Sequence, residues 1–114
     1  MHIDEGLKKM PYHFSAVPSR SGDQWWFNIP GQIIKSNFID IDKKYTVYFV
    51  EKDLNPNVKD LSYDQILSYY NFPAKPAKHS INQYHFTIPK RFIEDQYIFP
   101  EEKKKYWLFF IEEM

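Results

Sequence analysis

Basic, amide and imidazole side chains gather around two short segments of the chain, residues 24–29 and 83–88. Lysine and arginine attract the phosphates of a nucleic acid, and glutamine can reach the edges of its bases. Side chains alternate between the two faces of a strand, so Gln24, Gln83 and His85 are expected on the outward face. The predicted nucleic-acid-binding residues are Arg20, Gln24, Lys35, Lys78, His79, Gln83, His85, Lys90 and Arg91.

The same residues also fit an ordinary solvated surface, and this interpretation stays open. The chain has 15 Lys+Arg against 15 Asp+Glu, whereas nucleic-acid-binding domains usually carry a basic excess. The run Lys103-Lys104-Lys105 directly follows two glutamates, which favours a self-compensated turn over a binding patch. Trp26 is expected on the polar face, where it either stacks on a base or packs under a helix over residues 62–70; we favour the helix.

Several kinds of site are excluded by composition. The chain has no cysteine, which rules out disulfides, thiolate zinc sites and cysteine nucleophiles. It has only 3 glycines and no Gly-rich phosphate loop, nucleophile elbow or recognisable pair of carboxylates. The spacing of the histidines and acids does not predict a metal site. We therefore expect no enzymatic activity, no cofactor and no metal.

The elements that position these residues follow from an internal repeat. Segment 21–30 aligns with segment 80–89, with identical Ser, Gln, Phe, Ile and Pro, and the same alignment brings Arg20 onto His79. Segment 45–51 aligns with 106–112 after a short insertion in the second copy. Repeats of this kind indicate that one supersecondary unit is used twice.

Each copy is predicted to contain the same elements in the same order. Alternating apolar residues indicate a half-buried strand, and the proline that follows ends it and suits the first turn of a helix. Phe38 in copy one and Tyr97 in copy two are expected on the apolar face of the helix. A nearly continuous apolar segment then predicts a strand that is buried on both faces. The expected strands are 24–29, 83–88, 45–50 and 106–111, and the expected helices are 32–37 and 91–96.

Two further segments flank these copies. Residues 12–17 alternate and are expected to form a hairpin with strand 24–29. Residues 72–78, which contain two prolines, are interpreted as an extended linker. Between them, the pattern Ser62-x-x-Gln65 predicts a capping box that opens a short helix over residues 62–70.

The segment Phe86-Thr87-Ile88-Pro89-Lys90-Arg91-Phe92-Ile93 resembles the characteristic strand-to-helix motif of the AbrB/MazE-type swapped-hairpin (looped-hinge helix) DNA-binding family. Segment 27–34 is similar but lacks the lysine. Members of that family are usually dimers whose hairpins interleave into a small barrel that binds DNA, and many are transcription regulators or antitoxins. The resemblance implies two tandem copies that form the barrel as a pseudo-dimer within one chain.

The expected fold is therefore mixed and β-rich: a double swapped-hairpin-like β-barrel with short helices and one linker helix. The repeats are placed at 11–52 and 79–114, with a linker at 53–78, and together form one compact domain. The expected function is a DNA-binding transcription regulator or antitoxin-like protein that binds double-stranded DNA. The alternative is a non-enzymatic protein-interaction module, and a toxin or other protein partner and a homodimer stay open. The absence of a long apolar run and of a signal-peptide core predicts a cytoplasmic protein without membrane contact.

Overall fold

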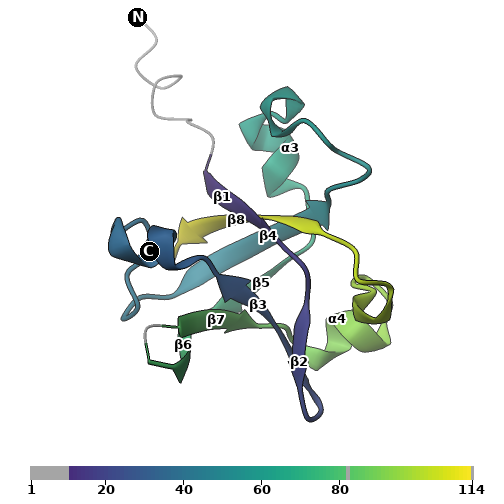
Figure 1. Ribbon diagram of the computed structural model, residues 1–114. Helices are drawn as coiled ribbons and strands as arrows, with labels where there is room; N and C mark the ends of the chain where they lie inside the picture. The colour runs from purple at the N-terminus through teal and green to yellow at the C-terminus, as the bar shows by residue number, and fades with distance from the viewer. Residues whose placement is uncertain (1–10, 82, 114) are drawn as a thin grey trace, which may run out of the picture.

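The computed structural model describes residues 11–81 and 83–113, which form eight strands, three short α-helices and two 3-10 turns (Figure 1). The sequence-based expectation that there is no signal-peptide core concerns residues 1–10, which lie outside this range. The strands are β1 (Tyr12–Ala16), β2 (Ser19–Ser21), β3 (Gln24–Ile29), β4 (Tyr45–Glu51), β5 (Asn71–Ala74), β6 (Ala77–Ser80), β7 (Gln83–Thr87) and β8 (Tyr106–Glu112). The helices are α2 (Gly31–Lys35), α3 (Tyr63–Leu67) and α4 (Lys90–Glu94), and the 3-10 turns are η1 (Val58–Asp60) and η2 (Pro100–Glu102).

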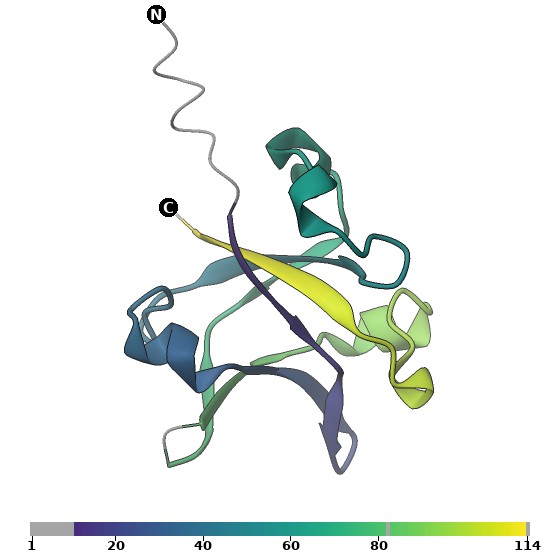
Figure 2. The same ribbon diagram turned by 45° about the horizontal axis from the view of Figure 1, so that its top comes forward.

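The strands make two four-stranded antiparallel sheets, in the orders β1-β8-β4-β5 and β2-β3-β7-β6. Figure 2 shows them as two layers, with the core between them. Phe27 and Phe86 of one sheet and Val47 and Leu108 of the other are fully buried there. The β-rich prediction is thus confirmed. The sheets do not close into a barrel, so the expected barrel is not confirmed.

The register of the central strands shows that the sequence repeat is also a structural repeat. Phe27 pairs with Phe86 where β3 meets β7, and these residues are the same position of the two aligned copies. Tyr48 pairs with Phe109 where β4 meets β8, and these too are one position of both copies. A residue that pairs with its own equivalent marks a two-fold axis. The central strands of both sheets therefore have two-fold-related pairing.

The segment interpreted as a linker is the main correction to the predicted elements. Most of residues 72–78 lie in β5 and β6, which pair with β4 and β7 as β1 and β2 pair with β8 and β3. Phe72, Ala74 and Pro76 correspond to Phe14, Ala16 and Pro18, one position out of step with the alignment of 21–30 with 80–89. An extra residue in the β6–β7 hairpin, at the bulge after Lys78, brings the two copies back into step. The expected start of the second repeat at 79 falls inside β6.

This register also changes one predicted equivalence. Arg20 pairs with Trp25, and Lys78 pairs with Tyr84. Because Trp25 and Tyr84 are the same position of the two copies, Arg20 corresponds to Lys78 and not to His79. Both copies therefore carry a basic side chain at this position of an edge strand.

Helices α2 and α4 are shorter than predicted because both end in the same way. Each follows a proline, and the residue after its C-cap is in the left-handed region, Asn37 with φ 60° and Gln96 with φ 63°. The N–H of Phe38 donates to Ile33 O, and the N–H of the residue before it donates to Ile34 O. These bonds make a Schellman motif, and the equivalent bonds end α4. The chain turns sharply there, so residue 38 leaves the helix face that the sequence assigned to it.

Helix α3 begins as predicted but covers a different surface. The Ser62 hydroxyl accepts a hydrogen bond from the Gln65 N–H at 3.1 Å, which caps the helix. Its buried residue Ile66 packs with Phe109 on the outer face of the β1-β8-β4-β5 sheet. Trp26 belongs to the other sheet, so the expectation that this helix covers it is wrong.

Candidate functional site

The structure distributes the nine predicted nucleic-acid-binding residues over several places instead of one. Gln24, Gln83 and His85 share the strand face turned away from the core, with Trp26 and with His79 of β6 beside them. The charged members lie elsewhere: Arg20 and Lys78 on the edge strands, Lys35 in the last turn of α2, and Lys90 and Arg91 in α4.

Trp26 and His85 are buried on that outer face, contrary to the expectation that His85 faces a nucleic acid. Trp26 is covered, as favoured, but by histidine rings and not by the helix. Trp26 and His85 are 5% and 6% exposed, and their rings stack with centroids 4.5 Å apart and planes 16° from parallel. His79 lies against the same indole at 4.8 Å, and Trp26 Nε1 donates to Asn28 Oδ1 at 3.0 Å. His85 is thus occupied by contacts within the protein.

The environment of His85 keeps its imidazole uncharged. Its Nδ1 is buried and has no hydrogen-bond partner in the part of the chain that the structure describes. Burial, and secondly the charge of His79, lower the pKa of His85 from its ordinary value. The Trp26–His79–His85 cluster therefore covers part of this face of the sheet, beside a groove of about 510 Å³ that Trp26, His79 and Gln83 help to line. The buried histidine of this cluster adds no positive charge near neutral pH.

Three of the predicted residues meet in a groove of about 780 Å³ beside α4, but acids accompany them. Arg20, Gln24 and Lys90 line it, together with Asp23, Glu94 and Glu101. Arg20 Nη1 lies 3.9 Å from Glu101 Oε1, and both side chains are largely exposed, so this ion pair contributes at most about 1 kcal/mol to stability. The lining has two basic and three acidic residues, and its charge is mixed.

A second kind of surface was not predicted: two solvent-exposed aromatic pairs. Among the residues described, the exposed large aromatic side chains are Tyr12, Phe38, Tyr70 and Tyr97. The rings of Tyr12 and Phe38 lie 4.4 Å apart, and those of Tyr70 and Tyr97 lie 4.3 Å apart. Tyr12 corresponds to Tyr70, with exposed fractions of 56% and 57%, and Phe38 corresponds to Tyr97, with 43% and 41%. The two pairs are therefore one feature present twice.

Each pair borders a groove. The first groove, of about 540 Å³, is lined by Pro11, Tyr12, Asn37, Phe38, Asp40, Lys43, Tyr45, Tyr63, Phe110, Ile111 and Glu112. The second groove, of about 450 Å³, is lined by Phe49, Val50, Glu51, Leu54, Ser68, Tyr69, Tyr70, Tyr97 and Tyr106. Both volumes lie in the range of about 300–1,000 Å³ typical of ligand sites. The shared lining consists of aromatic rings with few charges.

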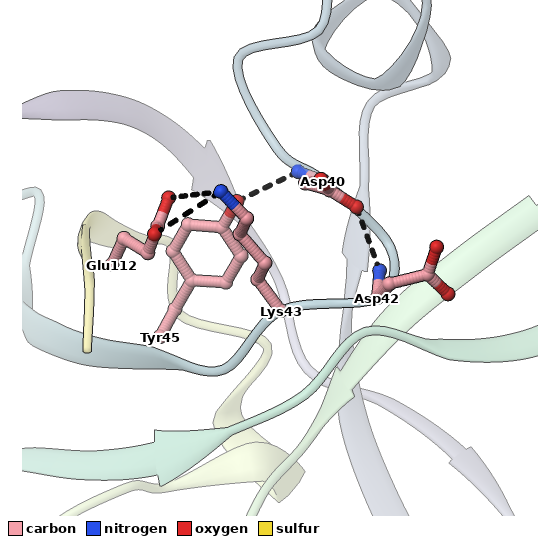
Figure 3. Close-up of polar contacts among 5 residues, drawn as sticks. All are labelled: Asp40, Asp42, Lys43, Tyr45 and Glu112. Atoms are coloured by element: carbon pink, nitrogen blue, oxygen red, sulfur yellow. Dashed lines mark hydrogen bonds and ion pairs between the residues drawn. The ribbon is translucent and has the colours of Figure 1, made fainter. Parts of the chain in front are cut away.

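Local structure fixes the aromatic pairs in the same way in both copies. The Schellman motifs turn Phe38 and Tyr97 outward, next to the aromatic residue at the start of β1 or just before β5. The buried hydroxyl of Tyr45 accepts a hydrogen bond from the Asp40 N–H at 2.7 Å, as Figure 3 shows. Its equivalent, Tyr106, accepts from the Phe99 N–H at 2.9 Å. These bonds tie the loop after each helix to a central strand.

Equivalent ion pairs border the two grooves. Lys43 Nζ lies 3.3 Å from one carboxylate oxygen of Glu112 and 3.5 Å from the other (Figure 3). At the corresponding positions of the other copy, Lys104 Nζ lies 2.8 Å from Glu51 Oε1. Hydrogen bonds to Glu51, and then to Glu102, raise the pKa of Lys104. The lysines are therefore engaged with carboxylates of the same chain.

No model of a known protein family matches the chain, and a search of curated proteins finds no similar sequence. Within the range that the structure covers, no helix is both long and apolar enough to cross a membrane. The described residues also contain no group of three or more potential metal ligands.

Proposed function

We propose that the chain is a protein-interaction module whose two grooves each bind a segment of a partner. The observation that carries this proposal is the exposure of the same aromatic pair at two equivalent positions. Exposed aromatic side chains supply much of the energy of protein interfaces, because they bury a large area at a small cost in conformational entropy. A structural role alone does not require these rings to stay in solvent in both copies.

The charges of the chain favour the same proposal. The basic residues best placed near the first strands share a groove with three acids, and the lysines beside the aromatic pairs are bound to glutamates. A nucleic-acid surface gains most of its affinity from unpaired basic side chains, whereas Arg20, Lys43 and Lys104 each form an ion pair with a glutamate of the same chain. An aromatic groove with few charges and a polar rim resembles the centre of a protein interface.

A selection from a random peptide library displayed on phage tests this proposal. We expect wild-type chain to enrich peptides that also bind as free synthetic peptides, and the double variant Tyr12→Ala/Tyr70→Ala to lose at least about tenfold in affinity for them. Ile81→Ala is the matched control, because this exposed side chain lines neither groove. Selected peptides that bind the double variant as well as the wild type would refute the grooves as the site.

DNA binding is the second candidate function, as a transcription regulator or antitoxin-like protein of the AbrB/MazE type. Two observations support it: Arg20 and Lys78 occupy equivalent positions on the edge strands, and the central strands have two-fold-related pairing. A two-fold arrangement of basic side chains suits the symmetry of duplex DNA. The swapped-hairpin relationship on which this candidate also depends stays a prediction.

Titration of duplex DNA at several salt concentrations separates the two candidates. If the chain binds DNA, its affinity should fall steeply with salt, because bound counterions are released from the phosphates. Lys90→Ala/Arg91→Ala should then weaken binding to all sequences and lower the salt slope by about two charges. Lys52→Ala/Lys59→Ala, outside the predicted surface, is the control. No binding of wild type at low salt would end the DNA candidate.

A further inference from the structure

The side chains that the two grooves share indicate which class of ligand each binds. This inference rests on the proposed interaction function. We propose that each groove binds an extended, proline-containing segment that carries a basic residue. The partner is a protein with two such segments, or two copies of a protein with one.

The edge strands disfavour a partner that adds a β-strand. Pro73 lies within the edge strand β5, and Pro76 lies between β5 and β6. On the other side, Pro11 precedes the edge strand β1 and Pro18 separates it from β2. Proline offers no N–H for a new ladder and is a common means of protecting sheet edges. A partner is therefore held by side chains in the grooves, not by backbone pairing.

The aromatic side chains provide flat apolar faces with hydroxyl groups at the edge. The ring of Tyr12 stacks on that of Phe110 with centroids 6.1 Å apart in the first groove, and the ring of Tyr70 stacks on that of Phe49 with centroids 6.2 Å apart in the second. Prolines in an extended polyproline helix place rigid rings against such faces, and aromatic-lined grooves are the usual site for them. The carbonyls of that helix have no internal partners, so they can accept hydrogen bonds from the exposed tyrosine hydroxyls. Little entropy is lost on binding, because the segment is already extended.

The charges indicate a basic residue in the ligand. Asp40 and Glu112 accompany one lysine, Lys43, at the first groove. At the second, Glu51 is the charged residue of the lining, and Lys104, outside the lining, pairs with both Glu51 and Glu102. Each groove therefore carries a net charge of −1 close to its aromatic rings. An arginine in the ligand can stack on a ring and approach a carboxylate at the same time, whereas an acidic residue would be repelled.

Isothermal titration calorimetry with a capped proline peptide that has one central arginine tests the inference on the full chain. We expect two peptides to bind per chain. Tyr12→Ala and Tyr70→Ala should each remove one site, and the double variant should lose both. Ile81→Ala, in a side chain exposed outside the grooves, should change nothing. The same peptide with alanine for proline, or with glutamate for arginine, should bind at least about tenfold more weakly.

Near-ultraviolet and far-ultraviolet circular dichroism of each variant shows that the fold is kept, which is expected because the replaced rings are largely exposed. The inference is overturned if the alanine peptide binds as well as the proline peptide, or if the double variant keeps both sites. If the proline peptide fails while library-selected peptides of another chemistry still need Tyr12 and Tyr70, only the ligand class is wrong. If no peptide depends on those residues, the interaction function falls as well.

Discussion

At the scale of single residues, His85 shows how burial sets charge in this chain. The imidazole stacks on Trp26, and its Nδ1 has no hydrogen-bond partner among the described residues. A proton added there would place a charge in apolar surroundings. The pKa of His85 is lowered by this burial and, to a smaller degree, by His79. The unfolded chain therefore takes up this proton at a higher pH than the folded chain does.

This difference predicts how stability depends on pH. The free energy of unfolding should be highest above the ordinary histidine pKa of about 6.5 and should fall as the pH decreases toward the lower pKa of folded His85. Denaturant unfolding at several values between about pH 5 and 8 measures the fall. His79→Gln should keep most of it, because burial is the main cause. A fall of the same size in His85→Gln would show that another group is responsible.

The sequence predicted which face of β3 carries Trp26, but not which side chains cover that face. Alternation correctly placed Trp26 on the face of β3 opposite Phe27, but it could not show what lies over that face. The covering side chains, His79 and His85, come from strands of the second copy, far along the chain from β3. Contacts between strands so far apart depend on register, which periodicity within one segment does not specify.

At the scale of elements, the left-handed residues after α2 and α4 decide where the aromatic side chains point. The helical periodicity predicted both helices but placed Phe38 and Tyr97 on their apolar faces. The Schellman motif ends each helix earlier, and no glycine marks it in the sequence, since Asn37 and Gln96 take the left-handed position. Without that glycine signal, the helix ends could not be predicted.

Gln96→Gly tests the cost of that conformation. A left-handed residue with a Cβ is disfavoured by roughly 1–2 kcal/mol, whereas glycine loses about 0.5–1 kcal/mol of backbone entropy. The variant should therefore be more stable than wild type by about 0.5–1 kcal/mol in chemical denaturation. Gln96→Ala keeps the Cβ and should change stability little. A glycine variant less stable than the alanine variant would show that a Cβ at this left-handed position costs no stability.

Strands β5 and β6 were missed because prolines in residues 72–78 resemble those of a linker. Proline is tolerated at the edge of a sheet, where its missing N–H faces solvent, and both strands are edge strands. The signal was present in the sequence: Phe72, Ala74 and Pro76 repeat Phe14, Ala16 and Pro18. This repeated pattern is shifted by one position relative to the alignment of segment 21–30 with segment 80–89, because the β6–β7 hairpin is one residue longer than the β2–β3 hairpin.

At the scale of the molecule, the two copies share the core between the sheets. Phe27 and Phe86 meet at the centre of one sheet and are fully buried against residues of the other. The repeat correctly predicted this equivalence and this burial. The grooves were not predictable in the same way, because each combines residues from separate segments that only the complete fold brings together.

Phe86→Ala should therefore destabilise both copies together. Removal of a fully buried ring costs about 3–5 kcal/mol, a large share of the stability of a small domain. Unfolding followed by tryptophan fluorescence and by circular dichroism should show one transition at a much lower denaturant midpoint. Phe38→Ala, in a ring that is 43% exposed, is the control and should cost under about 1 kcal/mol. Two separate transitions in Phe86→Ala would mean that the copies fold independently.

The pairing of β1 with β8 has a consequence for how the chain is made. Tyr12 lies opposite Phe110, so the first strand of the described chain completes its sheet only with the last. A ribosome adds roughly 5–20 residues per second, and β1 must therefore wait several seconds with its edge unpaired. Such distant pairing also slows folding itself, since a long loop must close before the contact is gained. The nascent chain is thus most prone to aggregate just before β8 emerges, and chaperone capture in that interval would protect it.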